Sequence, residues 1–86
     1  MSSAAKADAR VKRATVTDEL ITFHLMDGRV VSTPLSWSWR LSDATLAQRE
    51  NCEIMGDGEG VHWPDIDEDL SVDGMFNGVP ARRPKR

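Results

Sequence analysis

The sequence predicts an α+β domain: a small antiparallel sheet, entered through an N-terminal β-hairpin meander, with two short helices packed on it. Three observations support this class. Apolar and polar residues alternate from Glu19 to Met26, and the hairpin dipeptide Asp27-Gly28 follows at once. A segment of helix-favouring residues begins after Ser42. The length of 86 residues allows one small domain.

Composition sets the expected boundaries of this domain. With 40% hydrophobic and 29% charged residues the chain should fold, and we expect a single domain over residues 11–78. Residues 1–10 and 79–86 are expected to be disordered basic tails. No apolar run approaches the roughly 18 residues of a membrane span, and the start has no apolar signal segment. Together with a single cysteine, Cys52, this predicts a cytoplasmic protein.

The first two strands follow from β-branched residues and alternation. Residues 11–17 read Val-Lys-Arg-Ala-Thr-Val-Thr, which favours a strand. Residues 19–26 predict a half-buried strand whose core face carries Ile21, Phe23 and Leu25.

The dipeptide Asp27-Gly28 predicts a two-residue type I′ turn, because such a turn needs positive φ at both central residues. The chain then returns as a strand over residues 29–33, which Pro34 ends. The expected pairs are Leu25–Val30 and Phe23–Ser32 on the core face, and His24–Val31 and Thr22–Thr33 on the other face.

Helical structure is expected after Pro34. Residues 35–41 fit a short helical turn that lays Leu35, Trp39 and Leu41 on the sheet. Ser42 is expected to cap a helix over residues 43–51, without a capping box. The predicted buried side chains are Leu46, Ala47 and Leu41, and the predicted solvated ones are Gln48, Arg49 and Glu50.

The second half predicts two short strands and a last helix. Residues 52–55 and 61–63 are strand candidates, joined by a loop with three glycines and ended by Pro64. A final helix is expected over residues 68–75, capped by Asp65 or Asp67, with Leu70, Val72 or Met75 turned inward.

Charge is unevenly distributed along the chain, whose net charge is −3. No Lys or Arg lies between Arg49 and Arg82, and that stretch carries nine acids. The ends are basic. An acidic centre argues against nucleic acid as the partner of the folded part, although the basic tails could attract nucleic acid, fold back on the acidic face or simply aid solubility.

The acidic run is the first candidate for a metal site. It contains Asp65, Asp67, Glu68 and Asp69, whose oxygens would suit magnesium or calcium. The spacing does not fit a calcium loop, because Leu70 and Phe76 stand where that pattern has glycine and glutamate. We therefore interpret the run as capping and N-terminal charge of the last helix, and we expect no metal or other cofactor.

The remaining chemical candidates have structural explanations. His24 and His62 belong to no zinc pattern, and a Cys52–His62 thiolate pair has no local signature. The Gly56-Asp57-Gly58-Glu59-Gly60 segment lacks the Lys-Ser/Thr ending of a phosphate loop, so a hairpin loop is expected. No catalytic residue is predicted.

The three tryptophans are the most unusual feature of the composition of so short a chain. Trp is prominent in cores and in the energetically dominant parts of interfaces. We expect Trp63 and Trp39 to favour the core. Trp37 is equally compatible with the core and with an exposed binding patch near Arg40.

The order of several short motifs resembles the small bacterial family of domains of unknown function numbered 2442. The similarity covers about residues 14–78, and its most specific part is His62-Trp63-Pro64-Asp65-x-Asp67-Glu68-Asp69-Leu70-Ser71. Where the family commonly has Phe-Pro-Arg-Leu after the first Trp, this chain has Ser38-Trp39-Arg40-Leu41. The other matching segments are Asp27-Gly28-Arg29, Pro34-Leu35-Ser36-Trp37, Ala44-Thr45, Gln48-Arg49, Asn51, Gly58 to Val61, Val72 and Gly74.

The resemblance implies a compact α+β domain without assigned enzymatic activity. Members are often encoded beside another small protein, an arrangement similar to toxin–antitoxin pairs, and some longer members carry a helix-turn-helix domain. We therefore expect a non-enzymatic protein-interaction module with a small basic protein as partner, and its candidate role is the antitoxin-like or regulatory half of a gene pair. The alternatives are a nucleic-acid-binding regulator and, less favoured, a small metal-dependent enzyme. The predicted partner-binding residues are Trp37, Trp39, Arg40, Asp67, Glu68 and Asp69.

Overall fold

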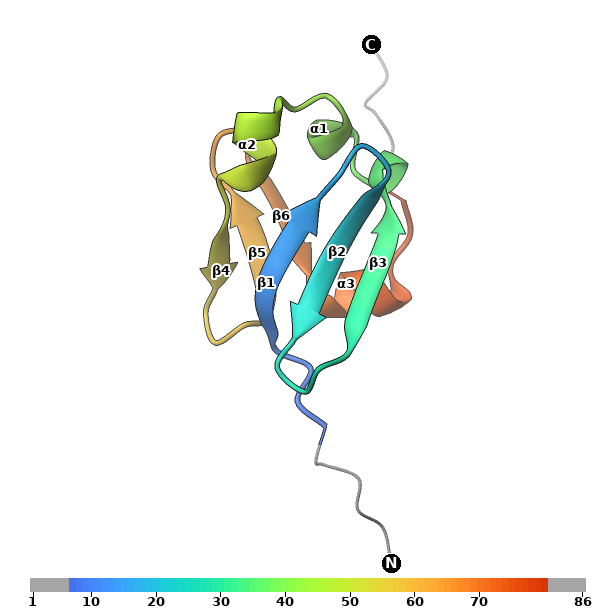
Figure 1. Ribbon diagram of the computed structural model, residues 1–86, viewed down its shortest axis with the longest axis vertical. Coiled ribbons are helices and arrows are strands. Elements are labelled where there is room, and N and C mark those ends of the chain that lie inside the picture. The colour runs from blue at the N-terminus through green and yellow to red at the C-terminus, as the bar shows by residue number, and fades with distance from the viewer. Residues whose placement is uncertain (1–6, 81–86) are drawn as a thin grey trace, which may run out of the picture.

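Two three-stranded antiparallel sheets form the frame of the structure, a computed structural model that describes residues 7–80 (Figure 1). Sheet A has the strand order β1 (Val11–Val16), β2 (Leu20–Leu25), β3 (Val30–Pro34). Sheet B has the order β4 (Glu53–Met55), β5 (Gly60–Trp63), β6 (Glu68–Ser71). The α+β class and the N-terminal meander are confirmed, and the later strands form a sheet of their own.

Short helices connect and follow the sheets. A 3₁₀-helix, η1 (Leu35–Trp37), and two helices, α1 (Trp39–Ser42) and α2 (Leu46–Glu50), lead from sheet A to sheet B. They lie together at one end of the sheets, whereas α3 (Val72–Asn77) follows β6 and lies behind β3 (Figure 1). The described chain thus has more helical segments than the two that were predicted.

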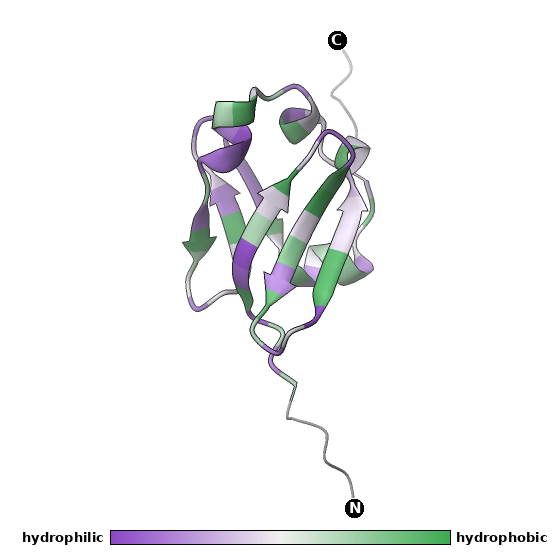
Figure 2. Cartoon of the chain, viewed as in Figure 1, coloured by the Kyte–Doolittle hydropathy of each residue, from purple (hydrophilic) through white to green (hydrophobic). Residues whose placement is uncertain are grey.

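The core lies between the inner faces of the two sheets. Hydropathy alternates along β2, and its apolar residues Ile21, Phe23 and Leu25 are fully buried (Figure 2). Val61 and Trp63 of β5 are fully buried from the other side. Each such side chain stabilises the fold by about 1.5–3 kcal/mol relative to exposure. The prediction that Trp63 is a core residue is confirmed.

The predicted type I′ turn is wrong by one residue. His24 pairs with Val30, and the Leu25 amide donates to the Arg29 carbonyl (2.9 Å), so the loop contains Met26, Asp27 and Gly28. Gly28 has φ +93°, whereas Asp27 stays at negative φ, as in a type I turn followed by a left-handed glycine.

The changed register moves side chains between faces of β3. Thr33 is buried and Val31 packs on the core, whereas Val30 and Ser32 face outward. This reverses the predicted assignment, because a slip of one residue exchanges the two faces of a strand.

The predicted helical turn over residues 35–41 is formed by η1 and α1, and the predicted helix over residues 43–51 is shortened to α2, with its own cap. The Ser38 hydroxyl accepts from the Leu41 amide and starts α1. Thr45 starts α2 through a capping box, in which its hydroxyl accepts from the Gln48 amide and the Gln48 side chain accepts from the Thr45 amide. Ser42 is therefore the last residue of α1 rather than a cap.

Part of the predicted burial is also reversed, although Leu41 is buried and Glu50 is exposed as predicted. Leu46 is 69% exposed, whereas Arg49 is only 8% exposed. The Arg49 guanidinium donates to the carbonyls of Leu41 (3.0 Å) and Ser42 (3.3 Å), and to the Asp18 carboxylate (2.8 Å). These bonds satisfy the C-terminal end of α1 and compensate the burial of the charge.

The predicted helix over residues 68–75 begins later than expected. Residues 64–67 form a turn in which Asp67 has φ +52°, and residues 68–71 return antiparallel to β5 as β6. The helix starts only at Val72, capped by the Ser71 hydroxyl, which accepts from the Gly74 amide. Pairing with β5 therefore overrides the capping role expected for Asp65 or Asp67. Val72 and Met75 are buried as predicted.

One backbone contact joins the first strand to the second sheet. The Val11 amide donates to the Gly58 carbonyl (2.7 Å) in the β4–β5 loop. Gly58 has φ +107°, and a Cβ there would lie 2.8 Å from the Cβ of Arg10. Only glycine permits this close approach.

Part of the predicted N-terminal tail contacts the folded body. The Asp8 amide donates to the Asp27 carboxylate (3.0 Å), and the Met26 amide donates to the Arg10 carbonyl (2.8 Å). Among the described residues, hydrogen bonding to the folded body thus begins at Asp8. The remaining residues of the two predicted tails, 1–6 and 81–86, lie outside the described residues.

We predict that Gly28→Val lowers the free energy of unfolding by more than about 1 kcal/mol, because a β-branched residue resists positive φ. No atom lies within 4 Å of the position of an added Cβ, so the cost is conformational. In a synthetic chain, Gly28→D-Ala should leave the stability within about 0.5 kcal/mol or raise it. Urea unfolding measures both, and equal losses for the two variants would contradict the turn assignment.

We predict that Arg49→Ala lowers the free energy of unfolding by about 2–4 kcal/mol, because the Leu41 and Ser42 carbonyls lose the bonds from the guanidinium and a buried side chain loses its packing. The neighbouring exposed Glu50→Ala should change it by about 0.5 kcal/mol at most. Asp18→Asn should also have a small effect, since the Asp18 side chain is 89% exposed. If Asp18→Asn lowered the stability as much as Arg49→Ala, the ion pair with Asp18 and not the bonds to the carbonyls would be the main stabilising interaction of Arg49.

Candidate interaction site

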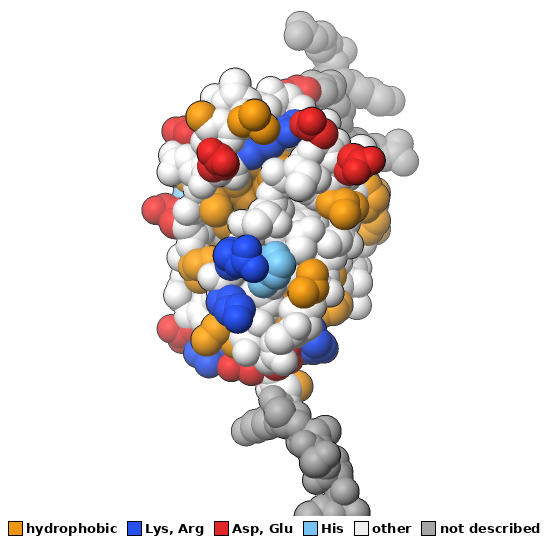
Figure 3. All heavy atoms as spheres, viewed as in Figure 1, with side chains coloured by type: hydrophobic (Ala, Val, Ile, Leu, Met, Phe, Trp, Pro, Cys, Tyr) orange, Lys and Arg blue, Asp and Glu red, His pale blue; other side chains and the backbone are white. Residues whose placement is uncertain are grey.

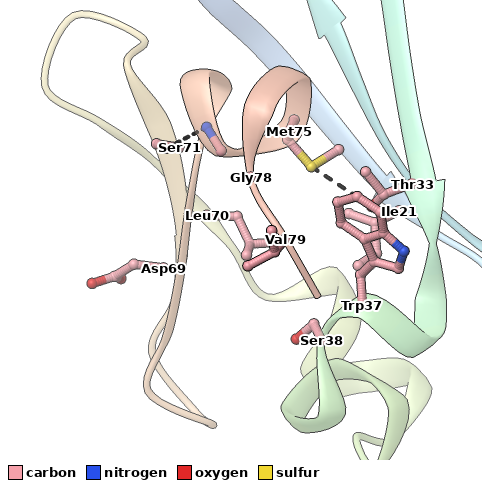
Figure 4. A pocket seen from close by; sticks show the side chains of 11 residues that line it. Ile21, Thr33, Trp37, Ser38, Asp69, Leu70, Ser71, Met75, Gly78 and Val79 are labelled. Atoms are coloured by element: carbon pink, nitrogen blue, oxygen red, sulfur yellow. Dashed lines mark hydrogen bonds between the residues drawn. The ribbon is translucent and has the colours of Figure 1, made fainter. Parts of the chain in front are cut away.

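A cavity of about 180 Å³ opens between β3 and β6, the edge strands of the two sheets (Figure 4). Within residues 7–80 neither strand pairs with a further strand on this side. We call this cavity the cleft. Its apolar lining comes from β2, η1, β6, α3 and the segment after α3, namely Ile21, Trp37, Leu70, Met75 and Val79.

Trp37 reaches the cleft because of the local sequence. Pro34 ends β3 with φ −58°, and the chain turns at once into η1, closed by the bond from the Ser38 amide to the Leu35 carbonyl (3.0 Å). Leu35 is buried in the core, and the half-buried Trp37 stands at one wall of the cleft (Figure 4).

The deep polar groups of the lining already have partners. The Thr33 hydroxyl donates to the Met75 sulfur (3.8 Å), and the Ser38 hydroxyl donates to the Glu68 carboxylate (2.6 Å). The surface that the cleft offers inside is therefore mainly apolar. An apolar side chain from outside could fill it without leaving a polar group unpaired.

The rim of the cleft is acidic on the side of sheet B. Asp69 belongs to the wall of the cleft, and its carboxylate, on a side chain that is 58% exposed, points away from the cavity on the outer face of sheet B (Figure 4). Glu53, His62 and Asp69 lie opposite one another on neighbouring strands, so they form one row across the outer face of sheet B. We call this the acidic row. The stretch from residue 50 to residue 81 has no Lys or Arg, so His62 is the one basic side chain in this row.

The acidic row changes the protonation behaviour of His62. Its Nδ1 is hydrogen-bonded to the Asp69 carboxylate, which raises the pKa of His62, and the charges of Asp69, Glu53 and Asp67 act in the same direction. His24 lies on the outer face of sheet A, where partial burial and the nearby Arg13 and Lys12 lower its pKa.

The structure brings two of the six predicted partner-binding residues to the cleft. Trp37 and Asp69 both line it, although they are far apart in the sequence. Trp39 and Arg40 lie in α1 with the guanidinium 4.8 Å from the indole ring centre, and neither lines the cleft. Trp39 is half-buried rather than a full core residue.

The structure corrects the expected exposure of Glu68, whereas Asp67 is exposed in the β5–β6 turn. Glu68 is 7% exposed because it lies opposite Trp63 on the inner face of sheet B. Its carboxylate accepts from the Ser38 hydroxyl and from the Asp69 amide. Glu68 therefore holds α1 against β6 and is not available to a partner.

The other chemical candidates are separated in space. Cys52 packs on the core while the adjacent Glu53 lies in the acidic row, so the thiol and His62 are on opposite faces of sheet B. Burial raises the pKa of Cys52, which keeps the thiol protonated at neutral pH. Within residues 7–80 no group of three His, Cys, Asp or Glu side chains is placed to hold a metal ion.

Sequence reasoning missed two residues of the site. Met75 forms part of the apolar lining, and Val79, which had been assigned to a disordered tail, lines the cleft as well. An apolar residue just after a helix and before a basic segment was the available signal for Val79.

The fold and the cleft define an α+β domain with two edge strands flanking an apolar cavity. The model of the family described as protein of unknown function (DUF2442) matches residues 11–81, so the chain belongs to this family. No match was found among curated proteins. No helix in the described part of the chain is long and apolar enough to cross a membrane.

Solved structures share the fold. A crystal structure of a protein of unknown function from Rhodospirillum rubrum is 28% identical, with a TM-score of 0.71, over 86% of this chain and 92% of that chain. The solution NMR structure of an uncharacterized protein from Chromobacterium violaceum is 23% identical, with a TM-score of 0.70, over 85% of this chain and 69% of that chain. Both comparisons agree with the α+β architecture described above.

We predict that NMR titration gives His62 the higher pKa and His24 the lower one. Asp69→Asn should lower the pKa of His62, because it removes the hydrogen bond that contributes most to the raised value. The pKa of His24 should stay unchanged. Since folding raises the pKa of His62, its contribution to stability is fully present below the unfolded value of about 6.5 and is lost as pH rises through the folded pKa. Equal titration of both histidines in the native chain would contradict the hydrogen bond to Asp69.

Proposed function

We propose that the protein is a non-enzymatic protein-interaction module that binds a small basic protein through the cleft and the acidic row. The observation that carries this proposal is the meeting of Trp37 and Asp69 at one apolar cavity. An aromatic wall beside a charged rim is the arrangement found where interface energy concentrates.

The cleft and the acidic row have different roles in the proposed binding. The cleft, with a volume of about 180 Å³, has room for one bulky apolar side chain of the partner. The carboxylates of Asp69, Glu53 and Asp67 attract Lys and Arg side chains that flank it. Attraction at the rim speeds the encounter, and burial in the cleft slows dissociation.

The absence of catalytic roles is part of the proposal. The protonated Cys52 thiol is unsuited to nucleophilic attack, and the His62–Asp69 pair has no adjacent hydroxyl or thiol hydrogen-bonded to it among the described residues. The module would act in the cytoplasm. The partner we propose is the product of a neighbouring gene, with this chain as the antitoxin-like or regulatory half of the pair.

One observation favours nucleic acid as an alternative partner. Lys12, Arg13 and His24 gather on the uncovered outer face of sheet A (Figure 3). Phosphate groups could bind there, with affinity that falls steeply with salt. Tight binding of duplex DNA at physiological salt, lost on Lys12→Ala with Arg13→Ala, would favour this alternative over the protein partner.

The test begins with capture from a lysate of the source organism, using the whole chain and its Trp37→Ala variant as parallel baits. A protein held by the first bait alone is then purified and measured by surface plasmon resonance. We expect a basic protein whose association rate falls as salt rises, since screening acts within about 8 Å at physiological strength.

We predict that Trp37→Ala weakens this binding by about thirtyfold, or 2 kcal/mol, mainly through faster dissociation. The matched control is Phe76→Ala, because Phe76 is 47% exposed, lies outside the cleft and should matter less than about threefold. Asp67→Asn together with Asp69→Asn should mainly slow association. An acidic partner, or equal effects of Trp37→Ala and Phe76→Ala, would contradict the proposed site.

A further inference from the structure

The segment after α3 already enters the cleft. The Gly78 amide donates to the Gly74 carbonyl (2.8 Å) and ends the helix, and Gly78 then has extended backbone geometry. Val79 follows and lines the cleft across from Trp37 (Figure 4). Its side chain makes little buried contact, since Val79 is 84% exposed.

The sequence beyond Val79 has the chemistry proposed for the partner. It continues Pro-Ala-Arg-Arg-Pro-Lys-Arg, so four of the last five residues are basic and none is acidic. The two prolines oppose a helix and favour extended backbone. An apolar residue followed by clustered bases is the pattern that an apolar cleft with an acidic rim would select.

The length of this segment suits the distance it would have to cover. Residues 81–86 can span at most about 20 Å when extended. The acidic row crosses three strands, which places its ends about 10 Å apart. Asp69 ends the row on the outer face of β6, an edge strand that also forms one wall of the cleft, so the bases would reach the row by passing round this edge after Val79 (Figure 4).

We propose that the C-terminal segment of residues 79–86 is an intramolecular occupant of this site. Arg82, Arg83, Lys85 and Arg86 bind the carboxylates of the acidic row and hold Val79 over the cleft. This inference rests on the proposed function, because it makes the segment a competitor that a basic partner displaces. The apparent affinity for the partner then equals the intrinsic affinity multiplied by the fraction of molecules in which the site is free.

The first test detects the contact itself in the whole chain. A nitroxide is attached at Arg86→Cys in a Cys52→Ala background, and paramagnetic broadening of backbone amides is recorded at low protein concentration. We expect the strongest broadening outside the segment itself in sheet B, where the acidic row lies, and its loss when NaCl is raised to about 1 M, where the Debye length is about 3 Å. Broadening confined to residues after Gly78, centred on sheet A, or growing with protein concentration would overturn the proposal.

A second test does not depend on whether the Cys52→Ala variant folds. The probe is an acetylated synthetic peptide with the sequence of residues 79–86, titrated into the whole chain and into the variant R82Q/R83Q/K85Q/R86Q. Because the variant's own segment competes less, it should bind the peptide at least about threefold more tightly. Asp69→Asn in this variant should remove that gain, whereas Asp57→Asn, an exposed charge in the β4–β5 loop, should leave it.

The outcomes separate this inference from the proposed function. Equal peptide affinity for the whole chain and the variant overturns the intramolecular occupant, even where a basic partner is captured and weakened by Trp37→Ala. Peptide binding at the cleft without any such partner supports the occupant and removes the proposed function. Both tests use only this chain and its own sequence, so neither depends on finding the partner.

Discussion

The buried guanidinium of Arg49 is the interaction on which the arrangement of the two sheets depends. It donates to the last carbonyls of α1, while the Arg49 carbonyl accepts from the indole nitrogen of Trp63 (3.0 Å). One residue thus ties the short helices to the centre of sheet B. Helices of four and five residues cannot persist on their own, so such external bonds decide whether they exist. Ser38 and Glu68 make the matching connection between α1 and β6, and so hold the two walls of the cleft that carry Trp37 and Asp69.

Local signals predicted the elements that depend on local chemistry. The alternation along β2 and the glycine in the following loop were sufficient for the meander, and the short apolar runs around residues 54 and 61 were sufficient for two strands of sheet B. The exact turn was not predictable from Asp27-Gly28, because the same dipeptide fits a two-residue loop and the last two positions of a three-residue loop. That difference of one residue decided which side chains of β3 face the core.

Other features depended on contacts between distant segments. An arginine in a short helix is ordinarily solvated, and nothing near Arg49 in the sequence indicates that α1 ends beside it with carbonyls that accept from its guanidinium. The acidic run suggested a helix start, yet pairing with β5 made it a strand and turned Glu68 inward. The candidate site could be predicted only in part. Trp37 and Asp69 were identified by residue type, but their meeting at one cavity required the tertiary fold.

The bond between Val11 and Gly58 has a consequence for the order in which the chain folds. Sheet A and sheet B are each built from neighbouring strands, so each needs only short loops to close. The Val11–Gly58 contact instead joins residues 47 positions apart and carries the larger loop-closure entropy. Two locally formed meanders would therefore dock late, and a glycine with no side chain in the way at their junction keeps that docking step free of steric obstruction. We expect the folding of this chain to consist of two locally formed meanders joined by one slower closing step.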